Sequence, residues 1–224
     1  MSVTVQTSED VMKIAKQLLW LAVWGVAFAY IESSVVVYLR KIYYPEGFAF
    51  PLAIAETRLI VVEIVREAAT LVILWATASL AYSRLQSRMA AFMVLFGIWD
   101  LFYYLFLKLI LDWPESLSSW DLLFLIPLPW VGPVWAPAVV ASGLVYAGTA
   151  ILMRNGQGSF LYFGSRFVWA EFIAASVIII SFLIPGCAVI EESVPDHFPY
   201  YLFWAGFAAG FGAFLYRFHR KSRR

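Results

Sequence analysis

Most of the chain consists of apolar runs that are separated by shorter polar segments. A helix needs about 20 mainly apolar residues to cross the hydrocarbon core of a bilayer. Six runs reach or approach that length, at about 17–39, 57–82, 90–111, 121–152, 166–186 and 199–217. We therefore expect an all-α, polytopic bundle of six transmembrane helices, in which residues 1–224 form a single membrane domain.

The fourth run is too long for one regular helix, and prolines interrupt it. They follow one another closely at Pro127, Pro129, Pro133 and Pro137. Proline removes a backbone donor and clashes with the preceding helical turn. We therefore expect a short interfacial or re-entrant segment at 117–128, followed by the fourth transmembrane helix at about 134–153. Irregular backbone at membrane depth is tolerated only where it is buried in protein or lines a wet cavity.

The composition supports a membrane protein. Hydrophobic residues make up 62% of the chain and charged residues 14%, whereas soluble domains carry about 45–50% and about 25%. A formal net charge of +1 and the lack of a basic, aromatic platform argue against nucleic acid as a partner. We expect the lipid bilayer to be the main partner, with other membrane subunits as an additional one.

The positions of Lys and Arg predict the orientation, because short cytoplasmic loops carry an excess of these residues. With six spans, the basic residues of both chain ends and of the second and fourth loops fall on one side. The third and fifth loops carry acidic residues and no Lys or Arg. We expect an integral protein of the plasma (inner) membrane with both termini in the cytoplasm.

The few Cys and His residues limit the cofactors. Cys187 is the only cysteine, and His197 and His219 both fall at the ends of predicted helices. The chain has no CxxCH motif for covalent haem and no phosphate-binding glycine loop ahead of a helix. We expect neither covalent haem nor a nucleotide, and no transition metal, because no histidine lies at the depth of the intramembrane acids.

The second span carries many ionisable residues for a transmembrane helix. Glu56, Glu63, Glu67 and Thr70 follow one another at spacings of seven, four and three, so they share one helix face. Arg66 flanks that face and can neutralise one carboxylate. A charge at mid-helix costs roughly 2.5–3.5 kcal/mol, so the second carboxylate needs a partner or a function of its own.

Spans one and three place further polar residues at matching depths. Glu32 falls in the outer half of the first span, Asp100 near the middle of the third, and Tyr104 one turn later. We expect these residues to meet the acidic face of the second span in one pocket. The predicted site for a ligand or proton is Glu32, Glu63, Arg66, Glu67, Asp100 and Tyr104. A structural ion-pair network that locks the helices together is the alternative.

Three outer residues are candidates for the mouth of this pocket: Glu56, Asp121 and Arg40. Asp121 has a second interpretation, because it or Ser118–Ser119 can cap a short helix before the fourth span. Arg40 serves no purpose in the predicted topology. It could bind an anion or a lipid headgroup, or it could only snorkel at the interface.

The sequence indicates no particular reaction, and it is compatible with three functions. The first is binding or movement of a proton, cation or small ligand at a site that opens to the extracytoplasmic side. The second is an accessory subunit of a larger respiratory or photosynthetic complex. The third is an intramembrane enzyme on a lipid-like substrate with Glu67 or Asp100 as acid or base, which we place last because no nucleophile or cofactor motif accompanies them. Tyr30, Trp99, Tyr103 and Tyr104 could stack on a planar ligand such as a quinone or sterol, although core packing explains them more simply.

Overall fold

The structure is a computed structural model that describes residues 2–52, 57–191 and 193–220. Six helices are described in these ranges: α1 (Ser2–Tyr43), α2 (Thr57–Ala81), α3 (Leu85–Leu111), α4 (Trp135–Gly156), α5 (Ser165–Ile190) and α6 (Tyr200–His219). Two short strands, β1 (Trp120–Phe124) and β2 (Trp130–Pro133), lie between α3 and α4 and pair antiparallel. The predicted helical bundle is therefore confirmed at the level of its six helices.

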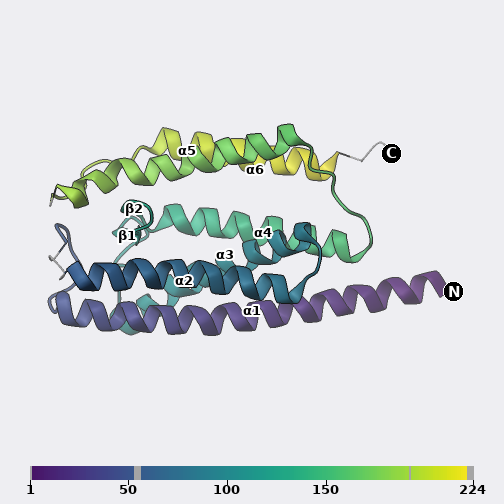
Figure 1. The fold of residues 1–224 in the computed structure, drawn as a ribbon, viewed down its shortest axis with the longest axis horizontal. Coiled ribbons are helices and arrows are strands. Elements are labelled where there is room, and N and C mark those ends of the chain that lie inside the picture. The colour runs from purple at the N-terminus through teal and green to yellow at the C-terminus, as the bar shows by residue number, and fades with distance from the viewer. Residues whose placement is uncertain (1, 53–56, 192, 221–224) are drawn as a thin grey trace.

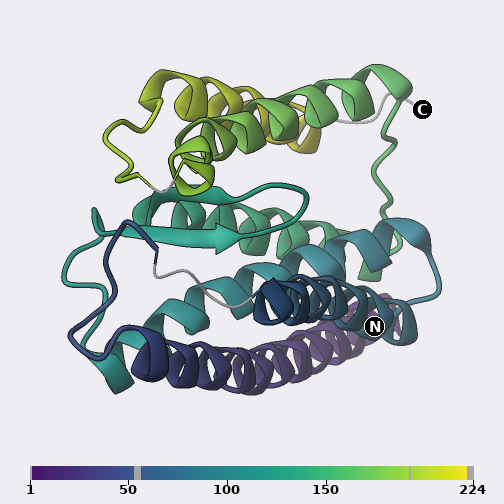
Figure 2. The same ribbon diagram turned by 60° about the vertical axis from the view of Figure 1, so that its left-hand side comes forward.

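The helices form three layers. Figures 1 and 2 show α5 and α6 side by side in one outer layer, the strands and α4 in the middle, and α1, α2 and α3 on the other side. The strands lie at one end of the bundle, which we call the hairpin end. The opposite end, where α2 leads into α3, carries Arg84, Arg88, Arg154 and Arg166 and is called the basic end.

Four stretches are long and apolar enough to cross a membrane, by length and composition: Val11–Tyr43 in α1, and the whole of α3, α4 and α5. The chain is therefore a multi-pass integral membrane protein whose surroundings are the lipid bilayer. The helices α2 and α6 are not among these four. Their place in the membrane depends on how the chain is threaded.

Helix α3 packs against three other helices, α1, α2 and α4. Two glycines allow α3 and α4 to approach closely. A Cβ atom on Gly97 would lie 2.5 Å from the Ala141 carbonyl oxygen, and one on Gly148 would lie 2.5 Å from the Ala90 carbonyl oxygen. Small residues serve this purpose in membrane bundles, where lipid offers no hydrophobic force to drive helices together.

We expect Gly148→Ala to destabilise the bundle by about 1–3 kcal/mol, because the added methyl group meets backbone that cannot move aside cheaply. The measurement is thermal unfolding of the purified protein in detergent. Gly212→Ala on α6 is the matched control, since nothing lies within 4 Å of its added Cβ. Equal unfolding temperatures for the two variants would contradict the close approach of α3 and α4.

The segment before α4 is a β-hairpin, and the expected short helix after Ser118–Ser119 was wrong. Trp120 pairs with Pro133, and Leu122 pairs with Val131. The turn before β1 uses its serines locally, because the Ser119 hydroxyl accepts a bond from the Ser116 N–H at 3.1 Å. The short apolar run of this segment does not distinguish strand from helix by its periodicity, which explains the error.

An apolar cluster joins the hairpin end to the outer layer formed by α5 and α6. Its fully buried members are Ala136, Phe182, Phe198 and Phe203, with Trp120, Trp130 and Trp135 packed against them. Strand β2 contacts α5 directly. The hairpin is therefore held between α5 and α6 on one side and the charged helices α1 and α2 on the other.

Candidate ligand-binding site

Arg66 of α2 connects α1 and α2 through two carboxylates. Its Nε donates to Glu63 Oε2 at 2.9 Å, one turn earlier on the same helix, and its Nη1 donates to Glu32 Oε2 on α1. The Thr70 hydroxyl donates to the same Glu32 oxygen at 2.9 Å. Glu32 is buried, and a buried charge needs compensation. One guanidinium and one hydroxyl provide it.

Glu67 takes a different partner, although it neighbours Arg66 in the chain. Its Oε2 accepts a hydrogen bond from the backbone N–H of Leu125 at 2.8 Å. Leu125 belongs to the connection between β1 and β2. This buried carboxylate therefore fastens the hairpin to α2 and has no ion-pair partner among the described residues.

Arg40 and Asp121 form a second, separate ion pair at the hairpin end. Arg40 Nη2 lies 2.8 Å from Asp121 Oδ1, and the Tyr104 hydroxyl donates to Asp121 Oδ2 at 3.1 Å. The guanidinium carbon also lies 3.6 Å from the ring centroid of Trp113 and 4.3 Å from that of Phe48, which is cation–π geometry.

Both members of this pair are buried, with side chains 8% and 2% exposed for Arg40 and Asp121. Burial raises the pKa of the Asp121 carboxyl, while the Arg40 guanidinium and the Tyr104 hydroxyl act to lower it. Neither external interpretation of Arg40 describes this arrangement, since the side chain binds an internal acid. Asp121 caps no helix, because it lies in β1.

Asp100 of α3 is the unusual member of the cluster. It is 8% exposed, and it makes no hydrogen bond or ion pair with any described residue. Its neighbour Trp99 also has a buried Nε1 without a partner. A buried charge without a partner is costly. The Asp100 carboxylate would therefore be stabilised by a bound ligand that donates a hydrogen bond or by protonation.

A small cavity lies beside Asp100. Its volume is about 40 Å³, and one water needs roughly 10–15 Å³ on this measure. The cavity therefore has room for a small polar guest. Its lining is Glu32, Arg66, Glu67, Thr70, Trp99, Asp100, Tyr103, Tyr104, Leu123 and Phe124.

A larger pocket of about 340 Å³ opens at the hairpin end, between α1, α2 and the hairpin. This volume lies in the range of about 300–1,000 Å³ that is typical of small-molecule sites. Its walls are mainly apolar, with Val36, Leu39, Leu59, Ile60 and Leu122 among them. Its ionisable acidic and basic residues are Arg40, Glu63, Arg66, Glu67 and Asp121.

The two spaces are neighbours, because Arg66, Glu67, Tyr103 and Leu123 line both. The charges around them do not balance. Two guanidinium groups face five carboxylates, and the five acids are Glu32, Glu63, Glu67, Asp100 and Asp121. One Arg40 nitrogen, Nη1, is buried without a partner. The site thus offers free acceptors at Asp100 and a free donor at Arg40.

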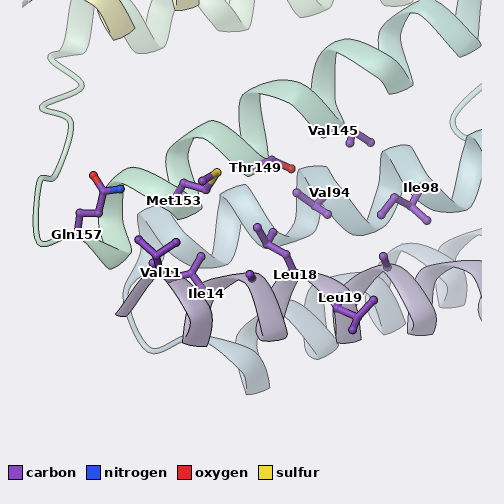
Figure 3. Close-up of a pocket in the computed structure, with 12 residues that line it drawn as sticks. Val11, Ile14, Leu18, Leu19, Val94, Ile98, Val145, Thr149, Met153 and Gln157 are labelled. Atoms are coloured by element: carbon purple, nitrogen blue, oxygen red, sulfur yellow. The ribbon is translucent and has the colours of Figure 1, made fainter. Parts of the chain in front are cut away.

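An apolar cavity elsewhere in the molecule serves as a contrast. It measures about 470 Å³ and lies between α1, α3 and α4, nearer the basic end. Figure 3 shows its lining, where Leu18, Val94 and Ile98 are typical and Thr149 and Gln157 are the polar members. Among the residues whose side chains the structure describes, no Asp, Glu, Lys or Arg lines it, so these residues offer no candidate chemistry.

The six residues predicted for the site lie around these two spaces. Glu32, Arg66, Glu67, Asp100 and Tyr104 line the small cavity, and Glu63 lines the larger pocket. Of the predicted mouth, Arg40 and Asp121 line the larger pocket, and Glu56 lies outside the described residues. Within the part of the chain that the structure describes, no three His, Cys, Asp or Glu residues are grouped to hold a metal ion.

Sequence reasoning left three site residues out of the predicted set. Helical spacing placed Thr70 on the acidic face of the second span, and Tyr103 was considered for stacking, but neither was included among the ligand- or proton-binding residues. The contact of the Leu125 N–H with Glu67 could not be predicted from helical spacing, because only the fold of the hairpin brings this N–H close to Glu67. Comparison of the chain with protein-family models, curated proteins and solved structures finds no match.

Proposed function

We propose that the protein binds a small amphipathic ligand in the 340 Å³ pocket at the hairpin end, with the ligand's polar group facing Glu67 and Asp100. The observation that supports this proposal is that the 340 Å³ pocket and the small cavity beside Asp100 adjoin each other. A pocket of ligand size has apolar walls, and at its inner side lies a polar cavity with an unpartnered carboxylate. The excess of acids favours a polar group that donates hydrogen bonds, such as a hydroxyl or an ammonium group.

The proposed topology has six crossings, with both termini cytoplasmic and the pocket on the extracytoplasmic side. The candidate spans in α1 and α3 both run toward the hairpin end, so α2 has to cross back between them. Helix α6 returns in the same way beside α5, and its 20 residues extend about 30 Å, the thickness of the hydrocarbon core. The arginines of the basic end support its cytoplasmic position.

A purely structural ion-pair network accounts for only part of the cluster. It explains Arg66 with its two acids, and Arg40 with Asp121. It does not explain Asp100, which strengthens no described contact and adds a desolvation cost. Binding also requires less than catalysis does, because the apolar walls and the unpartnered Asp100 suffice for it. A reaction here would depend on carboxylates, Thr70 and tyrosines, since no Ser, Cys, His or Lys is among the described residues that line the two spaces.

The test is native mass spectrometry of the full chain released from the membrane in a mild detergent. The wild-type protein should carry a non-protein adduct of small mass. Leu59→Trp places a larger side chain at the pocket wall and should remove that adduct. Leu109→Trp is the control, since Leu109 is 70% exposed on α3 and lies outside the pocket lining, so its adduct should persist. An adduct of equal abundance in both variants would refute the proposal.

Asp100→Asn separates a binding role from a structural one. The amide keeps the shape but removes the charge, so adduct occupancy should fall by about tenfold, the effect of one hydrogen bond to a charged group. The unfolding temperature should stay the same or rise, because Asp100 has no described partner to lose. Asp112→Asn, an exposed acid just after α3, is the control for both readouts. A large loss of stability in Asp100→Asn would show that the acid is structural.

A further inference from the structure

The structure assigns a second binding site, at the basic end, which we infer to take a phosphate ester that also carries a hydrogen-bond donor. A cavity of about 210 Å³ lies where α2 leads into α3, against the end of α4 and against Ile14 and Gln17 of α1. Tyr82, Arg84, Ser87 and Asn155 are its principal polar lining residues. None of its lining residues belongs to the hairpin-end pocket or the small cavity beside Asp100, so the two sites are distinct.

The first turn of α3 supplies the anion-binding part of this site. The helix begins at Leu85 with Arg84 as its N-cap, and the Arg84 side chain makes no capping hydrogen bond. The first N–H groups of a helix have no acceptor within the helix, and they carry the positive end of its dipole. Backbone donors of this kind bind phosphate groups readily.

Arg84 is the one charged side chain among the described residues that line the cavity. Arg84 forms no ion pair with any described residue, and its guanidinium carbon lies 3.8 Å from the ring centroid of Phe160, which holds it at the edge of the cavity. Residues 82–91 and 153–164 contain Arg88 and Arg154 but no Asp or Glu. An anion is therefore the charged group that these walls favour.

Two buried polar atoms at the cavity have no partner, and they indicate a ligand with more than a phosphate. Asn155 is 7% exposed, and its Nδ2 donates to Ser87 Oγ at 3.0 Å while its Oδ1 has no partner. Either orientation of this amide leaves one of its polar atoms unpaired. The Tyr82 hydroxyl is unpartnered as well. A hydroxyl or ammonium group beside the phosphate would satisfy Asn155, and the phosphate would accept from Tyr82.

The walls of the site are fixed by hydrogen bonds outside the cavity. Gln86 Nε2 donates to the Leu161 carbonyl at 2.7 Å, and Arg88 Nε donates to the Tyr82 carbonyl at 2.8 Å. The volume is below the range of about 300–1,000 Å³ for drug-sized ligands, which suits a headgroup-sized ligand. The same chemistry is found in the headgroup of a phospholipid and in a soluble phosphate ester.

The experiment measures binding of defined probes to the full-length protein in detergent by native mass spectrometry. The probes are phosphatidylglycerol, phosphatidylcholine, glycerol 3-phosphate and inorganic phosphate. Arg84→Gln and Tyr82→Phe should each raise the dissociation constant of the bound probe by about tenfold, and Tyr82→Phe keeps the ring that packs in the core. Arg166→Gln is the control, because this exposed arginine at the same end does not line the cavity, and its effect should stay within about twofold.

Tight binding of phosphatidylglycerol, with weaker binding of phosphatidylcholine, supports the site with a lipid as its source. Tight binding of glycerol 3-phosphate supports the site with a soluble ester as its source. The inference is overturned if no probe binds the wild type more tightly than Arg84→Gln, or if Arg166→Gln loses as much affinity. It is also overturned if phosphatidylcholine, whose headgroup carries no hydrogen-bond donor, binds as tightly as phosphatidylglycerol, because the donor would then play no part.

Discussion

Arg66→Gln should destabilise the protein by about 3–5 kcal/mol, the cost of removing one partner from a buried ion pair. The reason lies in the two acids that share this guanidinium. Glu32 and Glu63 both bond to Arg66, and a neutral amide would leave both carboxylates, which line the two spaces of the site, without a cation. The measurement is thermal unfolding of the purified protein in detergent, followed by near-ultraviolet circular dichroism.

The companion variant is the triple substitution Glu32→Gln, Glu63→Gln and Arg66→Gln. It removes all three charges together, so most of the lost stability should return, as it does when a buried ion pair is replaced as a unit. Arg166→Gln on the exposed start of α5 controls for the loss of any arginine. An Arg66→Gln protein as stable as the wild type would contradict the shared role of this cation.

Arg40→Gln should release the hairpin from α1 at a cost of a similar size, about 3–5 kcal/mol. Asp121 would keep its bond from Tyr104 but would lose its only ion-pair partner among the described residues. Packing of the guanidinium against Trp113 and Phe48 would be lost as well. Hydrogen exchange of the amides in β1 and β2 is the direct readout, because release of the hairpin exposes them.

Lys41→Gln is the matched control for this experiment, since Lys41 is the exposed neighbour of Arg40 on the same helix. Its hairpin amides should exchange as slowly as those of the wild type. The account of the Arg40–Asp121 pair fails if the two variants exchange at the same rate.

Much of the fold was accessible from the apolar pattern alone. The second, third, fifth and sixth apolar runs each coincide with a helix, α2, α3, α5 and α6, although α3 begins and α5 ends several residues beyond the run. Long apolar runs bounded by loops leave little choice of structure. Helix α1 extends beyond its predicted span of 17–39 to Ser2–Tyr43. The prolines placed the break before α4 correctly but did not specify a hairpin, since strand pairing depends on a partner segment that local sequence does not reveal.

The depth of the acids was also accessible, whereas their partners were not. Helical rise and spacing place Glu32, Arg66 and Asp100 at comparable levels, and the structure brings them to one cavity. Spacing says nothing about which acid receives the cation. Arg66 bonds to Glu32 and Glu63, while Glu67 takes a backbone N–H from the hairpin. That division depends on the hairpin, whose structure was predicted wrongly.

The partner of Arg40 could not be predicted from the sequence either. In the sequence it interrupts the charge pattern on the outer side, which indicates an external role. In the structure it is buried against Asp121, 81 residues later in the chain. A long-range pair of this kind leaves no trace in local spacing, because both residues lie near predicted boundaries where either could have faced solvent.

The most direct test of the proposed ligand site is an experimental density map of the protein in a lipid nanodisc. The account predicts elongated, non-protein density in the pocket between α1, α2 and the hairpin, with its polar end within hydrogen-bonding distance of Glu67 or Asp100. A pocket that is closed by side chains, with Asp100 paired to another residue, would contradict it.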